Sequence, residues 1–377
     1  MVWLPPSGGR GAPAPNFRLK PEATQAIDSQ ALRTWASVMR NMPRRMTLMA
    51  AALLVAAGLV HSEQAPAVTR SAVTPGEALD TTGWVCPMHS DYTADVQGTC
   101  PRCGMALVHA TPFDVRDYDL NFRTVPAVVR AGQRASLRFQ VEHPDTGEVV
   151  KKFETVHERQ YHLFVISQDM EHFEHIHPRE LADGTWTIEV TLPKPGYYKV
   201  LSDMLPSGGS SQFIARPLVT AGYSGDLVAN SARLVPDTTL TKTDADITAS
   251  VAYDPRQFVV GQYGHITYHL TDAVTGRPIT DLQTYLGAFG HTLIMSEDMA
   301  EYVHSHPLDI IASPADDGGP PVFKIPPGAD LEKLRGGPDV TFEGLMPKAG
   351  RYRAWTQFRR NDTLHTFAFT FEVVAAQ

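Results

Sequence analysis

An internal duplication constrains this chain more than any other feature of its sequence. Residues 161–178 align without a gap with residues 290–307, and both copies run from a strand-like start through Asp-Met to His-x-His-Pro. Downstream, residues 192–200 resemble residues 346–354, each with a Pro-Lys pair, a turn glycine and a tyrosine. A repeat of this size indicates two copies of one folding unit. We therefore expect two tandem domains with the same fold.

Short apolar or alternating stretches between Pro and Gly turns indicate β-strands in these domains. The clearest in the first copy are Ala135–Glu142, Tyr161–Ser167, Thr185–Leu192 and Tyr197–Asp203. We predict a mainly β chain, in which a small Cys/His metal ribbon precedes two tandem Ig-like β-sandwich domains related by duplication.

Two strand tyrosines bear on the type of sandwich. Tyr198 and Tyr352 each lie two residues after a turn glycine, the spacing of a tyrosine corner in immunoglobulin-like domains. A half-buried strand tyrosine with no such role is the alternative.

The N-terminal region has the features of a secretory signal. Arg44 and Arg45 precede the apolar run Leu48–Val60, which is too short to span a membrane. The charged part of a signal normally begins at the initiator, so residues 1–41 suggest a later start; a real leader with a short helix over residues 23–39 is the alternative. Three methionines fit as the true start: Met39, Met42 and Met46. We expect a periplasmic or secreted protein with no membrane span in its mature form.

Composition shifts divide the rest of the chain. We expect a leader and signal at 1–62, a linker at 63–82, a metal-binding module at 83–110, sandwich repeats at 113–221 and 245–377, and a surface loop inserted near 312–338. Loss of residues 1–62, which hold seven Lys/Arg and two Asp/Glu, moves the formal charge from −8 to −13. Such a surface repels nucleic acid and favours cations.

The only three cysteines lie close together. Cys86-Pro-Met-His89 and Cys100-Pro-Arg-Cys103 place ligand types three residues apart across two turns, which is the spacing of a closed tetrahedral Cys₃His site. An odd, clustered set argues against a disulfide framework. Met88 and Met105 add thioethers, which favour Cu(I), although they also suit a tiny apolar core. A purely structural zinc knuckle is the alternative.

At these residues the chain resembles the heavy-metal-binding domain of copper-exporting P-type ATPases and of periplasmic adaptors of metal efflux pumps. The usual text is Tyr-x-Cys-Pro-Met-His-Pro followed by Cys-Pro-x-Cys-Gly-Met-x-Leu. Leu107 fits the last position, whereas Trp84 replaces the tyrosine and Ser90 replaces the second proline. The resemblance covers about 25 residues. It implies binding of copper, as Cu(I), or zinc, and a metal-efflux pump or adaptor as a partner.

The duplicated segment carries three histidines in each copy. Both members of a His-x-His lie on one face of an extended strand, and a third imidazole from the strand start would complete a site for Cu(II) or Zn(II). The candidates are His162, His175 and His177 in the first copy, His291, His304 and His306 in the second, with Met170, Met299, Asp169 and Asp298 as additional ligands. Histidines that cap turns and bond to the backbone are the alternative.

Several other histidines lack this pattern. We expect His365, in the last strand, to be an exposed strand residue, and we expect no metal role for His157, His172, His265 or His269.

The motifs favour a non-enzymatic metal-binding protein that buffers, transfers or detoxifies copper or a similar ion. No nucleophile elbow, phosphate loop or dinucleotide fingerprint is present in the sequence. The alternatives are a copper oxidase or monooxygenase that uses the histidines, and an adaptor of a metal-efflux system whose sandwiches serve only for docking. The β repeats also loosely resemble the immunoglobulin-type sandwiches of periplasmic copper-handling proteins.

Overall fold

The structure is a computed structural model, and it describes residues 83–87, 92–101, 105–110, 117–223, 225–226, 228–307, 312–313, 322–323 and 330–376. The expected leader, signal and linker lie outside these residues, as does most of the inserted loop near 312–338. The described part of the chain has no helix with the length and apolarity needed to cross a bilayer.

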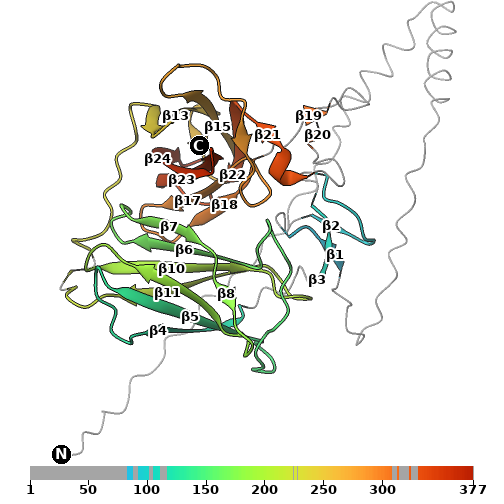
Figure 1. Cartoon of the computed structure of the whole chain (residues 1–377), viewed down its shortest axis with the longest axis vertical. Coiled ribbons are helices and arrows are strands. Elements are labelled where there is room, and N and C mark those ends of the chain that lie inside the picture. The colour runs from blue at the N-terminus through green and yellow to red at the C-terminus, as the bar shows by residue number, and fades with distance from the viewer. Residues whose placement is uncertain are drawn as a thin grey trace, which may run out of the picture. The chain divides into compact units, whose positions relative to one another are not determined.

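The expected mainly β architecture is confirmed (Figure 1). The module is a three-stranded antiparallel sheet with the order β2-β1-β3. Its strands are β1 (Gly83–Val85), β2 (Thr93–Ala94) and β3 (Val108–Ala110).

The first repeat is a sandwich of two four-stranded antiparallel sheets. One sheet has the order β4-β5-β9-β8, with β4 (Asp119–Val125), β5 (Arg134–Glu142), β9 (Trp186–Thr191) and β8 (Arg179–Glu180). The other has the order β11-β10-β6-β7, with β11 (Gln212–Val219), β10 (Tyr197–Met204), β6 (Tyr161–Ser167) and β7 (Phe173–Ile176).

The second repeat has the same two layers. One sheet has the order β12-β13-β15-β22, with β12 (Thr241–Asp244), β13 (Ile247–Asp254), β15 (Tyr263–Asp272) and β22 (Asp339–Leu345). The other contains β14 (Phe258–Val259), β24 (Thr363–Val374), β23 (Gly350–Arg360), β16 (Leu282–Gln283), β17 (His291–Ser296), β18 (Tyr302–Ser305) and β21 (Arg335–Gly336). Short elements β19 (Ala312–Ser313), β20 (Val322–Phe323) and the 3₁₀ turn η1 (Leu331–Lys333) precede β21.

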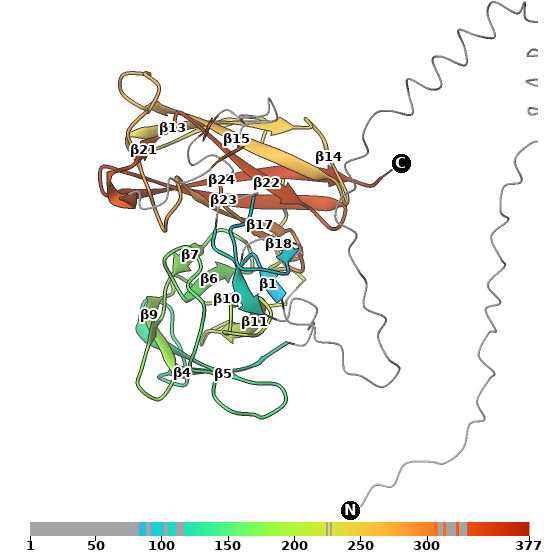
Figure 2. The same cartoon turned by 90° about the vertical axis from the view of Figure 1, so that its right-hand side faces the viewer.

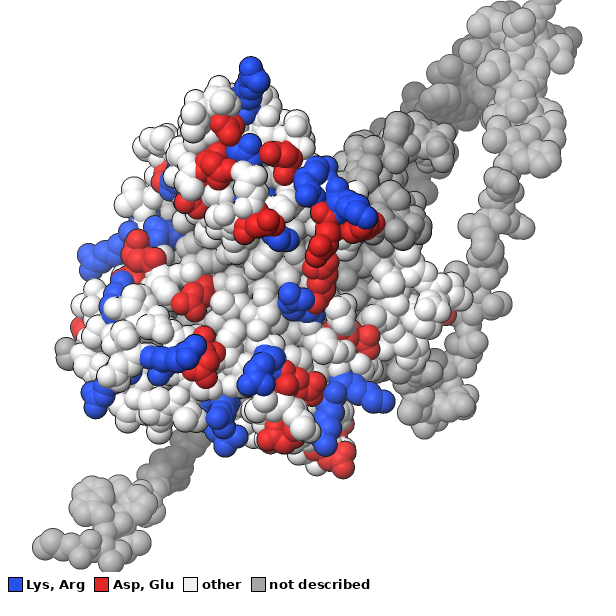
Figure 3. Space-filling view, in the orientation of Figure 1, with Lys and Arg blue, Asp and Glu red and all other residues white. Residues whose placement is uncertain are grey.

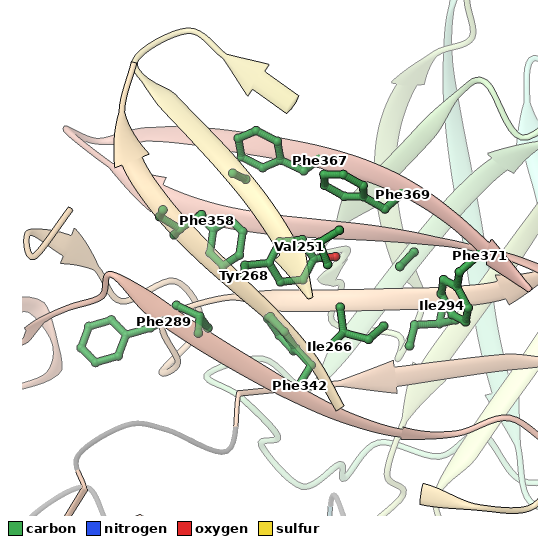
Figure 4. Packing of buried hydrophobic residues seen from close by; sticks show 14 of the residues in the cluster. Val251, Ile266, Tyr268, Phe289, Ile294, Phe342, Phe358, Phe367, Phe369 and Phe371 are labelled. Atoms are coloured by element: carbon green, nitrogen blue, oxygen red, sulfur yellow. The ribbon is translucent and has the colours of Figure 1, made fainter. Parts of the chain in front are cut away.

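Each sandwich encloses its own aromatic core. In the second repeat the ring of Tyr268 lies 5.4 to 5.9 Å, between centroids, from the rings of Phe342, Phe358 and Phe369 (Figure 4). Edge contacts at these spacings add stability beyond the burial of apolar area.

Strand β6 is buried on both faces, and this explains why its sequence is a continuous apolar run. Leu163 and Val165 point into the core of repeat 1, whereas Phe164 and Ile166 join a second apolar cluster. That cluster also contains Leu293 and Met295 of β17 in repeat 2. The two repeats therefore pack against each other through equivalent strands, and both views show β17 and β18 beside β6 and β7 (Figures 1 and 2).

Matched contacts join the two repeats. Phe173 of β7 stacks on Trp355 with 5.0 Å between ring centroids, and Tyr302 of β18 stacks on Phe213 at 3.8 Å. Equivalent cations, Lys199 and Arg353, each directly follow a corner tyrosine and donate to the carbonyls of Met299 and Met170 in the opposite repeat. The interface is thus an approximately twofold, self-complementary contact.

The segment between the repeats is also packed. Ala232 and Leu234 belong to the apolar cluster at the interface, and the Leu234 N–H donates to Glu297 Oε1 over 2.6 Å. Outside the interface, Lys/Arg and Asp/Glu are interspersed on the face that Figure 3 shows.

The tyrosine-corner prediction has a direct test in the hydrogen bonds. The Tyr198 hydroxyl donates to the Lys194 carbonyl over 2.8 Å, and the Tyr352 hydroxyl donates to the Lys348 carbonyl over 2.9 Å. Both repeats therefore contain the corner contact.

We expect Tyr198→Phe and Tyr352→Phe each to lower the free energy of unfolding by about 1 kcal/mol, because each removes one hydrogen bond and little apolar contact. Chemical denaturation measures this. Tyr197→Phe is the matched control, since its hydroxyl makes no hydrogen bond to the described residues. Equal midpoints for all three variants would contradict the corner's role.

Candidate metal centre

The cysteine module packs its thiols into a small core. Cys86 and Cys100 are each 1% exposed and cluster with Leu107, flanked by partly buried Trp84 and Tyr92. The Cys86 N–H donates to the Tyr92 carbonyl over 3.1 Å, and the Cys100 N–H donates to the Met105 carbonyl over 2.8 Å. Each cysteine thus begins a hydrogen-bonded loop, which brings residues from two distant turns into one cluster.

Part of the predicted ligand set cannot be placed. Met88, His89 and Cys103 lie outside the described residues, whereas Met105 is half-buried beside the second loop. The structure therefore brings together Cys86 and Cys100 of the predicted set.

Seven histidines gather where the two repeats meet. All are side chains of the facing sheets or of the turns beside them, and alternation along β7 and β18 puts each His-x-His on the interface side. Repeat 1 supplies His157, His162, His175 and His177, and repeat 2 supplies His291, His304 and His306.

One group consists of three imidazoles of repeat 1. His162, His175 and His177 have ring nitrogens within 4.8 Å of one another. His162 Nδ1 lies 3.1 Å from His175 Nε2, close to the ~3.3 Å that separates two nitrogens on a tetrahedral zinc ion. His162 Nε2 is fixed by the Val156 carbonyl at 2.9 Å, and His177 Nε2 has no hydrogen-bond partner among the described residues.

The second group draws on both repeats. His157 of repeat 1 stacks on His306 with 3.4 Å between ring centroids, and His291 lies 4.4 Å from His306. The ligand nitrogens of these three also lie within 4.8 Å of one another. His291 is 1% exposed, and neither of its ring nitrogens has a hydrogen-bond partner among the described residues. Buried polar atoms of this kind are rare without a ligand or a water.

His157 reaches this group because its backbone is in the left-handed region. His157 and Glu158 have φ values of 47° and 62° in a tight turn closed by Val156 and Arg159. The equivalent turn of repeat 2 has Leu286 where repeat 1 has His157, five residues before the strand histidine in each case. Two consecutive left-handed residues without glycine carry strain, which is often associated with functional positions.

His304 lies between the two groups. Its ring centroid is 4.6 Å from that of His306 and 5.6 Å from those of His162 and His175. His304 Nδ1 lies 2.7 Å from Asp203 Oδ2, whereas its buried Nε2 has no hydrogen-bond partner among the described residues. A carboxylate behind an imidazole is the usual partner of a metal-binding histidine.

The partner contacts follow the duplication. Asp203 and Gln357 each lie five residues after a corner tyrosine, and each holds a histidine of the opposite repeat. Gln357 Oε1 lies 3.1 Å from His175 Nδ1, and Asp203 Oδ2 lies 2.7 Å from His304 Nδ1. Equivalent positions therefore present an amide on one side and a carboxylate on the other.

Burial keeps these imidazoles neutral. Desolvation lowers the pKa of His162 to about 4 and that of His177 to about 3. Desolvation, reinforced by neighbouring imidazoles, also lowers the pKa of His175, His291 and His306 well below the ordinary range. At neutral pH all five have the uncharged form that binds metals.

A cavity of about 270 Å³ opens beside the centre. Its walls include His162, His304 and His306, together with Asp203. Pro87, which directly follows Cys86 of the module, lines the same cavity. The first turn of the cysteine module and the histidines therefore share one space.

Other predicted ligands have different surroundings. Met170 and Met299 are buried in the apolar interface cluster. Asp169 and Asp298 pair with Lys194 and Lys348. These contacts give the four residues structural partners, and neither aspartate joins a potential metal-binding group among the described residues.

Two expectations differ from the structure. We expected His365 to be exposed, but it is 1% exposed, with Nδ1 3.1 Å from the Asp244 carbonyl and Nε2 3.1 Å from Asp246 Oδ1. We expected one site per repeat, but His157, which had no predicted role, groups with His291 and His306 in place of His304. Asp203 and Gln357 were also missed. The offset from each corner tyrosine is the sequence signal that pairs Asp203 with Gln357.

Residues 84–110 match the family described as Heavy metal binding domain, which confirms the expected heavy-metal-binding segment. No curated protein matches the chain.

Solved structures with similarity include two bacterial adhesins. FdeC of Escherichia coli is 11% identical, with 69% of this chain and 66% of that chain covered and a TM-score of 0.22. InvE of Yersinia pseudotuberculosis is 10% identical, with 68% and 60% covered and a TM-score of 0.19. The chain spans less than two thirds of the length of either structure.

A second family covers both sandwich repeats. Its matches are to residues 114–216 and 242–375, which together make up more than half of the chain. The chain therefore belongs to the family described as Domain of unknown function (DUF8832).

Proposed function

We propose that this protein is an exported copper-binding protein that buffers or transfers copper in the periplasm and contributes to metal resistance. The observation that carries the proposal is the buried histidine centre, in which His291 has two ring nitrogens without hydrogen-bond partners among the described residues. A heavy-metal-binding segment lies in the same chain, and its Pro87 lines the cavity beside that centre.

The two ligand sets suit different states of one metal. Thiolates of Cys86, Cys100 and Cys103, with His89 or a thioether of Met88 or Met105, are soft donors that favour Cu(I). Neutral imidazoles suit Cu(II) and Zn(II) as well. A chain with both sets can hold copper in either oxidation state, which is useful in an oxidising compartment.

A purely structural role for the histidines is less consistent with their contacts. Structural buried histidines have polar groups beside their ring nitrogens, as His365 has the Asp244 carbonyl 3.1 Å from Nδ1 and the Asp246 carboxylate 3.1 Å from Nε2. By contrast, His177, His291 and His304 have buried ring nitrogens with no such partner among the described residues. Leaving a buried polar group unsatisfied costs about 1 to 3 kcal/mol, which a bound metal would offset.

A transfer role is supported by the position of the module. Because Pro87 and three centre histidines line one cavity, we propose that an ion released from the module enters a space that also contains imidazoles. We propose that a metal-efflux pump or adaptor is the external partner, and the secretion signal in the sequence supports a periplasmic location.

A copper-dependent oxidase or monooxygenase is the second candidate. The observation that favours it is the cavity, because chemistry on a small molecule needs space beside an open metal position. Two exposed residues offer a matched pair of positions for testing the cavity. Ser211 lines its wall, whereas Ala229 lines a separate cavity of about 540 Å³.

Metal titration of the chain from Glu63 tests the proposed function. We expect Cys100→Ser/Cys103→Ser to lower Cu(I) affinity more than about 100-fold, since even a residue that only orients a ligand contributes about 10- to 100-fold. We expect His291→Gln to weaken Cu(II) binding while leaving thiolate-bound Cu(I) unchanged. His265→Gln, a histidine outside the centre, is the control. Undiminished binding of both ions by the respective variants would refute the proposal.

Oxygen uptake separates the two candidates. If the protein is an oxidase, the copper-loaded chain with excess ascorbate consumes oxygen faster than the same copper in buffer, and Ser211→Trp abolishes most of this uptake by filling the cavity. Ala229→Trp is the matched control. We expect a metal carrier, so uptake should not exceed the buffer rate.

Acid should destabilise the metal-free protein. Between pH 6.5 and about 4 the unfolded chain protonates its histidines, whereas folded His162 and His177 stay neutral. Stability is therefore full above pH 6.5 and falls by up to ~1.4 kcal/mol per pH unit for each such histidine as the pH drops. Denaturation midpoints against pH measure the slope, which should be shallower in His162→Gln/His177→Gln. Identical slopes would show that burial does not suppress protonation of these two imidazoles.

A further inference from the structure

The number of imidazoles exceeds what one ion uses. Zinc and copper sites in proteins generally take three or four protein ligands. The centre offers two separate three-imidazole groups and a seventh imidazole, His304. One ion with four ligands would leave three of the seven imidazoles uncoordinated.

The two groups are in contact. The ring centroids of His175, in the first group, and His291, in the second, lie 5.8 Å apart. His304 is within 6.0 Å of rings in both groups. Ions bound to the two groups would therefore be close neighbours in one enclosure.

His304 has the chemistry of a further ligand. With Asp203 Oδ2 accepting a hydrogen bond from His304 Nδ1–H, the neutral imidazole carries its lone pair on Nε2. That nitrogen is buried, and the ring lines the cavity together with His162 and His306. Asp203 belongs to the opposite repeat, so the orientation of His304 depends on the packed interface.

We propose that the interface holds a pair of metal ions, one bound by His162, His175 and His177 and the other by His157, His291 and His306. His304, oriented by Asp203, is an additional ligand at the junction of the two. The proposal rests on the proposed metal-binding function and adds to it the number of ions, their proximity and the ligand roles of His157 and His304.

The test uses the chain from Glu63 with Cys86, Cys100 and Cys103 replaced by Ser, titrated with Cu(II) and followed by metal analysis and EPR. We expect two tightly bound equivalents. The second equivalent of Cu(II) should broaden or diminish the EPR signal of the first and produce a half-field line, because the two unpaired spins are close. His157→Leu, which copies the residue at the equivalent turn of repeat 2, should leave one equivalent with an isolated signal.

Asp203→Asn tests the role of His304. We expect it to weaken one of the two equivalents by about 10- to 100-fold. Asp339→Asn is the matched control, because Asp339 Oδ1 lies 2.7 Å from His269 Nδ1 in the same kind of pair outside the centre. Equal effects of the two variants would overturn the assigned role of Asp203.

The outcomes also separate this inference from the function on which it rests. One equivalent with an undisturbed signal, or two equivalents whose signals add without coupling, would overturn the ion pair but keep the histidine metal site. Absence of any imidazole-bound copper would remove both. If a variant unfolds, as judged by its near-ultraviolet circular dichroism, His177→Gln takes its place. His177 is only partly buried, so the fold should tolerate this change. The variant should also leave one uncoupled equivalent of Cu(II).

Discussion

Burial of imidazoles between the two repeats, nearly complete for His162, His175, His291 and His306, is the constraint on which the rest of this structure depends. Positive charge is unfavourable in that volume, and the lowered pKa values of His162 and His177 reflect this. The lowered pKa values keep these imidazoles neutral at neutral pH, and a neutral imidazole has a lone pair that can bind a cation. The apolar contacts around them, such as Phe173 on Trp355, keep water out and hold the two repeats together. Packing and ligand chemistry in this protein are therefore two aspects of one interface.

Much of the architecture was predictable from the sequence. The duplication, the strand alternation, the corner tyrosines and the shared face of each His-x-His depend on local periodicity, and each has a counterpart in the structure. The heavy-metal-binding segment was also predictable, because its ligand types are close together in sequence.

The composition of the histidine centre was not predictable in the same way. His157 reaches the opposite repeat through a strained turn, and Asp203 and Gln357 act across the interface. No periodicity of a single strand reveals which repeat a side chain will face. The prediction that His365 is exposed was wrong for the same reason. Its place in the last strand suggested exposure, but in the fold it contacts Asp244 and Asp246 of the second repeat. Tertiary contacts decide such positions.

The matched positions of Asp203 and Gln357 also bear on how the centre arose. An ancestral unit with one repeat would have paired with a second identical copy, and any change at this position would have appeared on both sides at once. Two repeats in one chain are not under that restriction. One side could then keep a carboxylate while the other acquired an amide, and a histidine could be present in one turn and a leucine in the other. The two halves of the centre consequently differ in the charge and hydrogen bonding that they offer to their histidines, which a homodimer of identical subunits cannot achieve without breaking its own symmetry.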